Sequence, residues 1–172
     1  ELSNEEFETT KTLAKELESM GVEVHVDEER GTGLIGIIHG AKPGKAIALR
    51  ADIDALPVQE HNTFDFKADV DGKMHACGHD GHMAILLGAA KMLTAMKDRI
   101  EGDVYLAFQP AEETGAGAPD FMKFDNWFEK IDAIFGGHVW IDLPAGLISV
   151  EAGPRMAASS KITINVKGKQ GH

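Results

Sequence analysis

Segments with the apolar pattern of strands alternate with helix-like segments along this 172-residue chain. Apolar residues at helical spacing predict helices over residues 7–20, 81–97 and 119–128. Strand-like runs occur at residues 22–26, 34–39, 45–51, 104–108, 131–135, 147–150 and 161–167. The alternation predicts an α/β fold with a mixed, mostly parallel central sheet and helices on both faces.

Capping signals mark two of the predicted helices. Ser3 and Glu6 have the spacing of a capping box before the first helix, and Asp80 is placed to cap the second. The second helix is apolar on most of its faces, so we expect it to be buried.

Three predicted strands are each followed by reactive side chains: Asp52 and Asp54 after the strand at 45–51, Glu112 and Glu113 after 104–108, and His138 after 131–135. Ligands of open α/β sheets bind beyond the carboxyl ends of the strands. We therefore expect these groups to share one cleft. For the two aspartates, a turn before Pro57 and a supporting role at the cleft both remain open.

Residues 74–82 read Met-His-Ala-Cys-Gly-His-Asp-Gly-His and contain the only cysteine of the chain. A thiolate and imidazoles are good ligands for a borderline-soft divalent metal. Cys77 alone would most often be a small buried hydrophobe, but with His79 two positions away the pair suits two ligands of one metal centre. For His75 and His82, coordination and simple packing are equally open.

The adjacent glutamates and His138 can complete such a site. Glu112 and Glu113 could be a solvated loop pair, but they follow an apolar strand and precede a glycine-rich stretch. Neighbours on an extended backbone point in opposite directions, so one carboxylate can bind metal while the other faces the reacting water. Two glycines precede His138 and allow the backbone to approach a ligand closely, which favours coordination over a structural role.

One motif is rejected. Residues 31–36 match the dinucleotide pattern G-x-G-x-x-G letter for letter. That pattern needs a helix that opens directly on it. Residues 37–40 are strand-like and lead to a proline turn, so we predict a glycine-rich hairpin.

Composition excludes some classes of partner. No basic stretch offsets the net charge of −11, so we expect neither a nucleic-acid partner nor an anionic membrane surface. The longest apolar run, residues 83–90, is too short to cross a bilayer. A single cysteine rules out an internal disulfide and indicates a reducing, cytoplasmic location.

Four segments resemble one enzyme family in order along the chain: Leu-Arg-Ala-Asp-Ile-Asp-Ala-Leu-Pro at 49–57, residues 74–82, Phe-Gln-Pro-Ala-Glu-Glu at 108–113 and Gly-His-Val at 137–139. They are similar to the amidohydrolases that include hippurate hydrolase, N-acyl-amino-acid deacylases of the aminoacylase type and auxin-conjugate hydrolases. These enzymes belong to the dinuclear aminoacylase and carboxypeptidase-type metallopeptidases, which have a zinc-exopeptidase-like catalytic domain.

The resemblance implies a role for each candidate residue. The implied metal ligands are Cys77, His79, Glu113 and His138. Glu112 would be the general acid/base, and Asp54 would support the metal centre. Two divalent ions per subunit are implied, Zn²⁺ or Mn²⁺, with Ni²⁺ or Co²⁺ possible on ligand chemistry.

The resemblance also implies a domain organisation. Residues 1–159 would be the N-terminal part of the catalytic domain, and residues 160–172 the start of an inserted α+β dimerisation domain. Gly-Lys-Gln-Gly-His at 168–172 resembles the Gly-Lys-Gly-Gly-His of that insert, with Gln170 in place of a glycine. His172 would reach the partner subunit's cleft in a homodimer and help to stabilise the oxyanion. The family's last metal-binding histidine has no match, so the chain resembles the N-terminal part of a longer enzyme and is expected to be inactive alone.

The implied reaction is hydrolysis of the amide bond of a small N-acylated amino acid or a short peptide-like substrate. The metals would activate a water, and Glu112 would move its proton. One rival is a cysteine hydrolase with Cys77 as nucleophile and His79 or His75 as base. Another is a metal-binding module without turnover.

Overall fold

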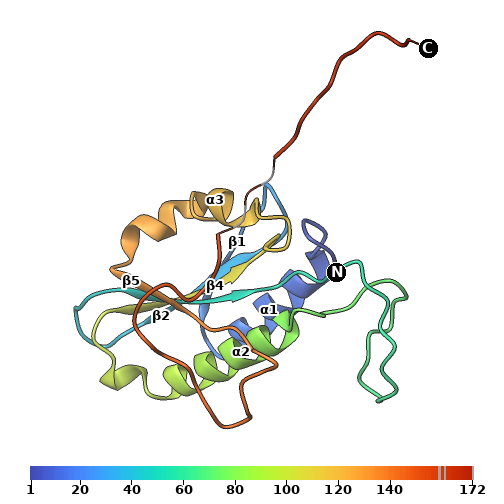
Figure 1. Ribbon diagram of the computed structural model, residues 1–172. Helices are drawn as coiled ribbons and strands as arrows, with labels where there is room; N and C mark the ends of the chain where they lie inside the picture. Colours follow the sequence, from blue (N-terminus) through green and yellow to red (C-terminus); the bar gives the residue numbers. More distant parts are fainter. Residues whose placement is uncertain (159, 161, 172) are drawn as a thin grey trace. The chain divides into compact units, whose positions relative to one another are not determined.

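A five-stranded mixed sheet organises the first 140 residues of the computed structural model (Figure 1). The structure describes residues 1–158, 160 and 162–171. By internal contacts the chain divides into two units, Glu1–Trp140 and Ile141–His172. The predicted domain boundary between residues 159 and 160 stays a prediction.

The strands of the sheet are β1 (Glu23–Val26), β2 (Leu34–His39), β3 (Ile47–Asp52), β4 (Asp103–Gln109) and β5 (Ala133–Gly136). Their spatial order is β1-β2-β4-β3-β5. β3 pairs in parallel with both β4 and β5, whereas the β1–β2 and β2–β4 pairs are antiparallel. The prediction of a mixed sheet is confirmed, but parallel pairing does not predominate among the described strands. A short loop joins β1 to β2, and such a connection can only make an antiparallel hairpin.

That hairpin contains the rejected dinucleotide pattern. Gly31 and Gly33 both have positive φ angles, of 76° and 82°. A Cβ at Gly33 would lie 2.6 Å from Cδ of Pro110, so the loop also approaches the end of β4 closely. The predicted glycine-rich hairpin is confirmed.

The helical segments are α1 (Phe7–Ser19), α2 (His79–Ala95), η1 (Lys97–Arg99), α3 (Gly117–Phe121) and η2 (Phe124–Lys130). α1 and α2 lie on one face of the sheet and α3 and η2 on the other (Figure 1). The helix predicted at 119–128 is replaced by the two short helices α3 and η2, and η2 is itself kinked at Asp125 and Asn126, which have φ angles of 50°.

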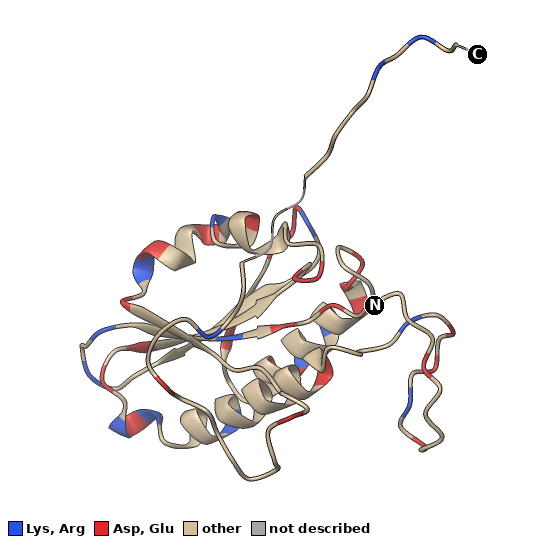
Figure 2. Ribbon diagram, in the orientation of Figure 1, with Lys and Arg blue, Asp and Glu red and all other residues tan. Residues whose placement is uncertain are grey.

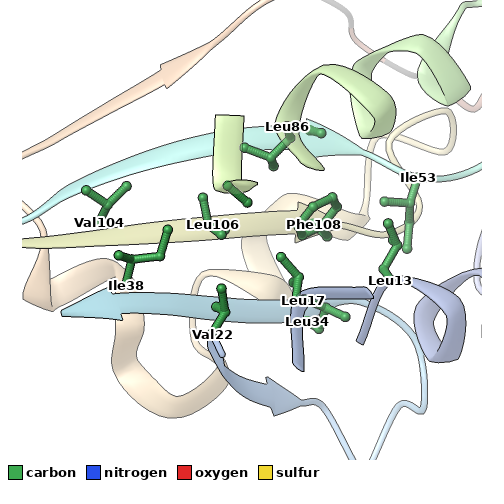
Figure 3. Packing of buried hydrophobic residues seen from close by; sticks show 12 residues of the cluster. Leu13, Leu17, Val22, Leu34, Ile38, Ile53, Leu86, Val104, Leu106 and Phe108 are labelled. Carbon is green, nitrogen blue, oxygen red and sulfur yellow. The ribbon is translucent and has the colours of Figure 1, made fainter. Parts of the chain in front are cut away.

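Each face of the sheet has its own hydrophobic core. On the α1–α2 face, Leu17, Leu34, Leu106 and Phe108 are fully buried, and Leu86 of α2 packs against them (Figure 3). On the other face the core consists of Ile35, Ile37, Ala48, Tyr105, Ala107, Phe121 and Trp127. The prediction of helices on both faces is therefore confirmed.

The capping predictions are wrong. Neither α1 nor α2 has a side-chain cap. Ser3 donates instead to Asp54 Oδ2 at 2.6 Å, and Glu6 accepts the backbone N–H of Ala111 at 2.8 Å. Asp80 lies inside the first turn of α2, after the N-cap Gly78. Tertiary partners therefore compete successfully for the side chains that were expected to cap helices.

α2 is also less buried than predicted. Figure 2 shows few charged residues along it, yet Ile85 and Met92 are 65% and 67% exposed. One face of the helix packs on the sheet, and no described element covers the other. No helix among the described residues has the length and apolarity that a bilayer crossing requires.

The unit Ile141–His172 contains two of the predicted strands. Residues 147–150 and the described residues 162–167 form none, so both predictions are wrong for this chain. Ile148, Ile162, Ile164 and Val166 are more than 80% exposed. A strand needs a neighbour for its backbone hydrogen bonds, and no described residue of this unit pairs with them in a ladder.

Candidate metal centre

The predicted site residues meet at the carboxyl edge of the three parallel strands. β3 leads to Asp54, β4 to Glu112 and Glu113, and β5 to His138, while the start of α2 brings Cys77 and His79. Three groups of side chains have ligand atoms within 4.8 Å of one another: Cys77, His79 and His138; His79, Glu112 and Glu113; and Asp52, His79 and His82. His79 belongs to all three and is their common centre.

His79 is buried and held from one side. Its Nδ1 lies 2.8 Å from the carbonyl oxygen of Asp54 and 3.3 Å from the Asp54 carboxylate. Its Nε2 is buried without a hydrogen-bond partner. Because Nδ1 must donate to Asp54, the lone pair of Nε2 is free to bind a metal. A metal-binding histidine is oriented in this way by a partner at its other nitrogen.

Carboxylates surround the free nitrogen of His79. Its Nε2 lies 3.8 Å from Glu113 Oε1 and 3.9 Å from Glu112 Oε2. Glu113 Oε1 is itself buried without a hydrogen-bond partner. Burial lowers the pKa of His79, but Asp54 and Asp52 outweigh it, and the pKa lies above its usual value.

Cys77 and His138 lie next to each other, with Sγ of Cys77 3.4 Å from Nε2 of His138. Thiolate and imidazole ligands of one tetrahedral zinc would be about 3.5 Å apart, from bond lengths near 2.3 and 2.0 Å. Gly78 makes this approach possible, because it has a φ of 90° and a Cβ there would lie 2.3 Å from Cγ2 of Val139. Cys77 lies in the turn before α2, and His79 is the first residue of that helix.

Two buried ligand-type atoms without partners, His79 Nε2 and Glu113 Oε1, show that these residues fit a metal. Such atoms cost free energy unless something binds them. Sites that combine thiolate, imidazole and carboxylate suit zinc, and imidazole with carboxylate also admits manganese, nickel or cobalt.

The glutamate pair differs from the prediction in one respect. Residues 112–115 form a turn, not an extended segment, so both carboxylates reach towards His79. The turn begins at Ala111, which has a φ of 53°, and the buried Glu6 holds its N–H. Glu113 is the less exposed of the two side chains, at 20% against 40% for Glu112.

Asp54 connects several parts of the candidate site through hydrogen bonds. It is 1% exposed and accepts hydrogen bonds from the Ser3 hydroxyl at 2.6 Å and the Glu113 N–H at 3.0 Å. Burial alone would raise its pKa, but hydrogen bonds from His79, Ser3 and Glu113 hold the pKa of Asp54 at about 2. The carboxylate stays charged and ties α2, the N-terminus and the glutamate turn together.

The sequence left the role of His82 open and predicted a capping box for Ser3 and Glu6. His82 uses both ring nitrogens, one with Asp52 and one with the Val139 N–H, which favours packing over coordination. His75 belongs to none of the three groups formed by described residues. The position of the two N-terminal residues could not be found from local pattern, because their partners are 51 and 105 positions away.

The cysteine-hydrolase alternative is disfavoured. Burial, with Glu113 and Glu112 nearby, raises the pKa of the Cys77 thiol to about 11. A nucleophilic cysteine needs the opposite shift, towards a thiolate at neutral pH. A bound cation would compensate the same negative surroundings.

A mixed α/β sheet here gathers thiol, imidazole and carboxylate groups around one buried histidine, which is the arrangement of a metal-binding site at the strand ends of an α/β domain. The model of the family described as Peptidase family M20/M25/M40 matches residues 48–170. The chain belongs to that family. The resemblance seen in the sequence is thereby confirmed.

Curated relatives and solved structures agree with this assignment. The chain is 46% identical to thermostable carboxypeptidase 1 of Saccharolobus solfataricus, over all of this chain and 44% of the carboxypeptidase. It is 40% identical to the N-acyl-L-amino acid amidohydrolase of Geobacillus stearothermophilus, over all of this chain and 46% of that enzyme. The YxeP protein of Bacillus subtilis, described as a dinuclear metal-binding peptidase of the M20 family, superposes with a TM-score of 0.85 and 45% identity, covering 90% of this chain and 43% of YxeP.

The chain spans less than half the length of these relatives. All predicted site residues except one lie together at the carboxyl edge of the sheet; His172 lies outside the described residues. The individual roles of the site residues stay predictions.

Proposed function

We propose that the whole protein is a metal-dependent hydrolase that cleaves the amide bond of N-acyl amino acids. The observation that carries the proposal is the buried Nε2 of His79, which has no hydrogen-bond partner and has ligand-type atoms of Cys77, His138 and Glu113 around it.

Cys77, His79, Glu113 and His138 would hold two divalent ions, Zn²⁺ or Mn²⁺. Ions in such a site lower the pKa of water and polarise the substrate carbonyl. Asp54 would keep His79 oriented, because it accepts a hydrogen bond from Nδ1 of His79 and its carboxylate remains charged. The buried Oε1 favours Glu113 as the ligand of the glutamate pair.

Glu112 is the better placed of the two glutamates for proton transfer. Its side chain is more exposed to the cleft, and its Oε2 lies 3.9 Å from the same nitrogen of His79. It would accept a proton at Oε2 from the attacking water and deliver it to the amine that leaves.

The proposed substrates are small N-acylated amino acids or short peptide-like amides. Named relatives support this class, because they include an N-acetylcysteine deacetylase of Bacillus subtilis at 45% identity and the N-acyl-L-amino acid amidohydrolase. A carboxypeptidase at 46% identity keeps peptides within the proposal.

By resemblance, the whole protein would be a homodimer in which His172 serves the partner's cleft as an oxyanion donor. A cytoplasmic location stays a proposal from the single cysteine of this chain. A His172→Ala variant is expected to lose about 10²–10³-fold in turnover. Mixed with a Glu112→Gln variant, it should recover activity, because one site of a heterodimer then has an intact Glu112 and a wild-type His172. Heterodimers as inactive as both parents would contradict the cross-subunit role.

The proposed activity is tested on the whole protein with matched N-acetyl and N-benzoyl amino acids and with dipeptides. We expect hydrolysis that disappears after complete chelation and returns with Zn²⁺ or Mn²⁺. Activity that survives chelation would favour the cysteine hydrolase. Stoichiometric metal with no turnover of any amide would favour the binding module.

A further inference from the structure

A continuous chain of hydrogen bonds starts beside the candidate metal centre, where Asp52 Oδ2 lies 3.5 Å from His79 Nε2. Arg50 Nη1 donates to Asp52 Oδ2 at 2.8 Å, and Asp52 Oδ1 lies 2.6 Å from His82 Nδ1. His82 Nε2 accepts the backbone N–H of Val139 at 2.9 Å. The chain therefore connects β3, α2 and the segment that follows β5.

The direction of these hydrogen bonds defines which ring nitrogen of His82 carries the proton. A nitrogen that accepts an N–H cannot carry a proton, so His82 has its proton on Nδ1 and donates it to Asp52. Asp52 and His82 are only 1% and 5% exposed. Hydrogen bonds to a buried charged acceptor are among the stronger ones in proteins.

Val139 is the residue directly after His138, and this segment is only partly buried. Val139 and Trp140 are 43% and 57% exposed. Close contacts come from three residues: Gly78, where a Cβ would lie 2.3 Å from the Val139 side chain, the His82 ring, whose centroid is 4.7 Å from that of His138, and Cys77, whose Sγ lies 3.4 Å from His138 Nε2. The N–H of Val139 thus fixes the peptide unit that joins it to His138.

We propose that the buried Asp52–His82 pair positions His138 for metal binding by holding the amide of Val139, with Arg50 orienting Asp52. His82 is a positioning residue in this proposal and not a ligand, because both of its nitrogens are already used. The inference rests on the proposed function in so far as His138 binds metal. It assigns a role to the second histidine of α2, which the proposed catalytic mechanism does not use.

Three substitutions separate the effect of the His82 hydrogen bond to Val139 from the effect of packing along α2. His82→Phe keeps a ring but cannot accept the Val139 N–H. His82→Gln places a carbonyl oxygen where Nε2 was and can accept it. Leu86→Ala, one turn along α2, weakens the packing of the same helix face but leaves every member of the chain in place.

Two quantities are measured in the whole protein. The first is hydrogen exchange of peptides that span residues 137–140 in the metal-free state. The second is zinc affinity, by competition with a chelator. His82→Phe should speed exchange at Val139 and weaken zinc binding by about 10–100-fold, the usual effect of removing a partner that orients a metal ligand. His82→Gln should restore most of both, and Leu86→Ala should change zinc affinity much less.

Zinc affinity of His82→Phe equal to that of the wild type would overturn the proposal. So would an equal loss in Leu86→Ala, because the effect would then follow from weaker packing alone. Failure of the proposed function gives a different result: the wild type itself would bind no zinc, while exchange at Val139 would still report whether His82 holds the segment.

Discussion

The two ends of the sheet carry the same kinds of side chain and use them differently. At the end opposite the site, His39 Nε2 lies 3.2 Å from Glu23, and its Nδ1 lies 3.2 Å from Asp103. These side chains are 37–58% exposed. At the carboxyl edge, His79 is 1% exposed and keeps one nitrogen without a partner.

Histidine and carboxylates at the exposed end satisfy one another and water. Hydrogen bonding to Glu23 raises the pKa of His39, as for an ordinary surface ion pair. At the buried end, ligand-type atoms remain unsatisfied and the surroundings are negative, which a cation would compensate. Burial with leftover bonding capacity, and not residue type, distinguishes a candidate site from a surface cluster.

Glu112→Gln should give the largest difference in turnover between a substitution at the carboxyl edge of the sheet and the same substitution at the opposite end. In the whole protein we expect a loss of about 10²–10⁴-fold in turnover, because the amide cannot accept a proton. Metal content should stay at the wild-type level. Glu23→Gln makes the same change at the exposed end and should leave turnover unchanged. A Glu112→Gln variant with normal metal and normal turnover would remove Glu112 from the mechanism.

Cys77→Ser should weaken metal binding strongly. The loss should exceed the roughly 10–100-fold effect that is typical of removing a residue that only orients a metal ligand. A neutral hydroxyl is a much poorer ligand than a thiolate. Metal content by elemental analysis and affinity by chelator competition provide the measurement. Unchanged stoichiometry and affinity would mean that Cys77 is a buried structural cysteine.

Asp54→Asn tests how much the buried carboxylate at the carboxyl edge of the sheet stabilises the fold, and this test needs no metal. The pKa of Asp54 is about 2 against a usual 3.8, so the carboxylate stabilises the fold by about 2 kcal/mol above its unfolded pKa. This stability is lost as the pH falls from about 4 towards 2. Urea unfolding at neutral pH should show the loss in the variant, and its stability should depend less on pH in the acid range. Equal curves for both proteins would contradict the assigned hydrogen bonds.

His39→Ala should have the smallest effect. Exposed ion pairs contribute about 0–1 kcal/mol, and salt screens them. We expect a change within that range in urea unfolding and none in metal affinity. A loss of metal after this substitution would show that the two ends of the sheet are not independent.

Several features of the fold were predictable from local pattern. β2 covers the residues predicted, and β1, β3, β4 and β5 differ from their predictions only at the ends. Alternating or continuous apolar runs identify strands when neighbours exist to pair with them. Residues 162–167 have an equally clear alternation, yet they form no strand, and no described residue pairs with them in a ladder.

The sequence by itself determined the family, the residue types of the candidate metal centre and the strand ends that bring them to one edge, because short motifs carry this chemistry in a few adjacent residues. Only the tertiary structure decided which nitrogen of His79 remains free, that both glutamates turn towards it, and that Ser3 and Glu6 hold the site and do not cap a helix. It also revealed the link from Asp52 through His82 to Val139. Such contacts join residues that are 25 to 105 positions apart, and their hydrogen bonds depend on burial, which no local pattern contains.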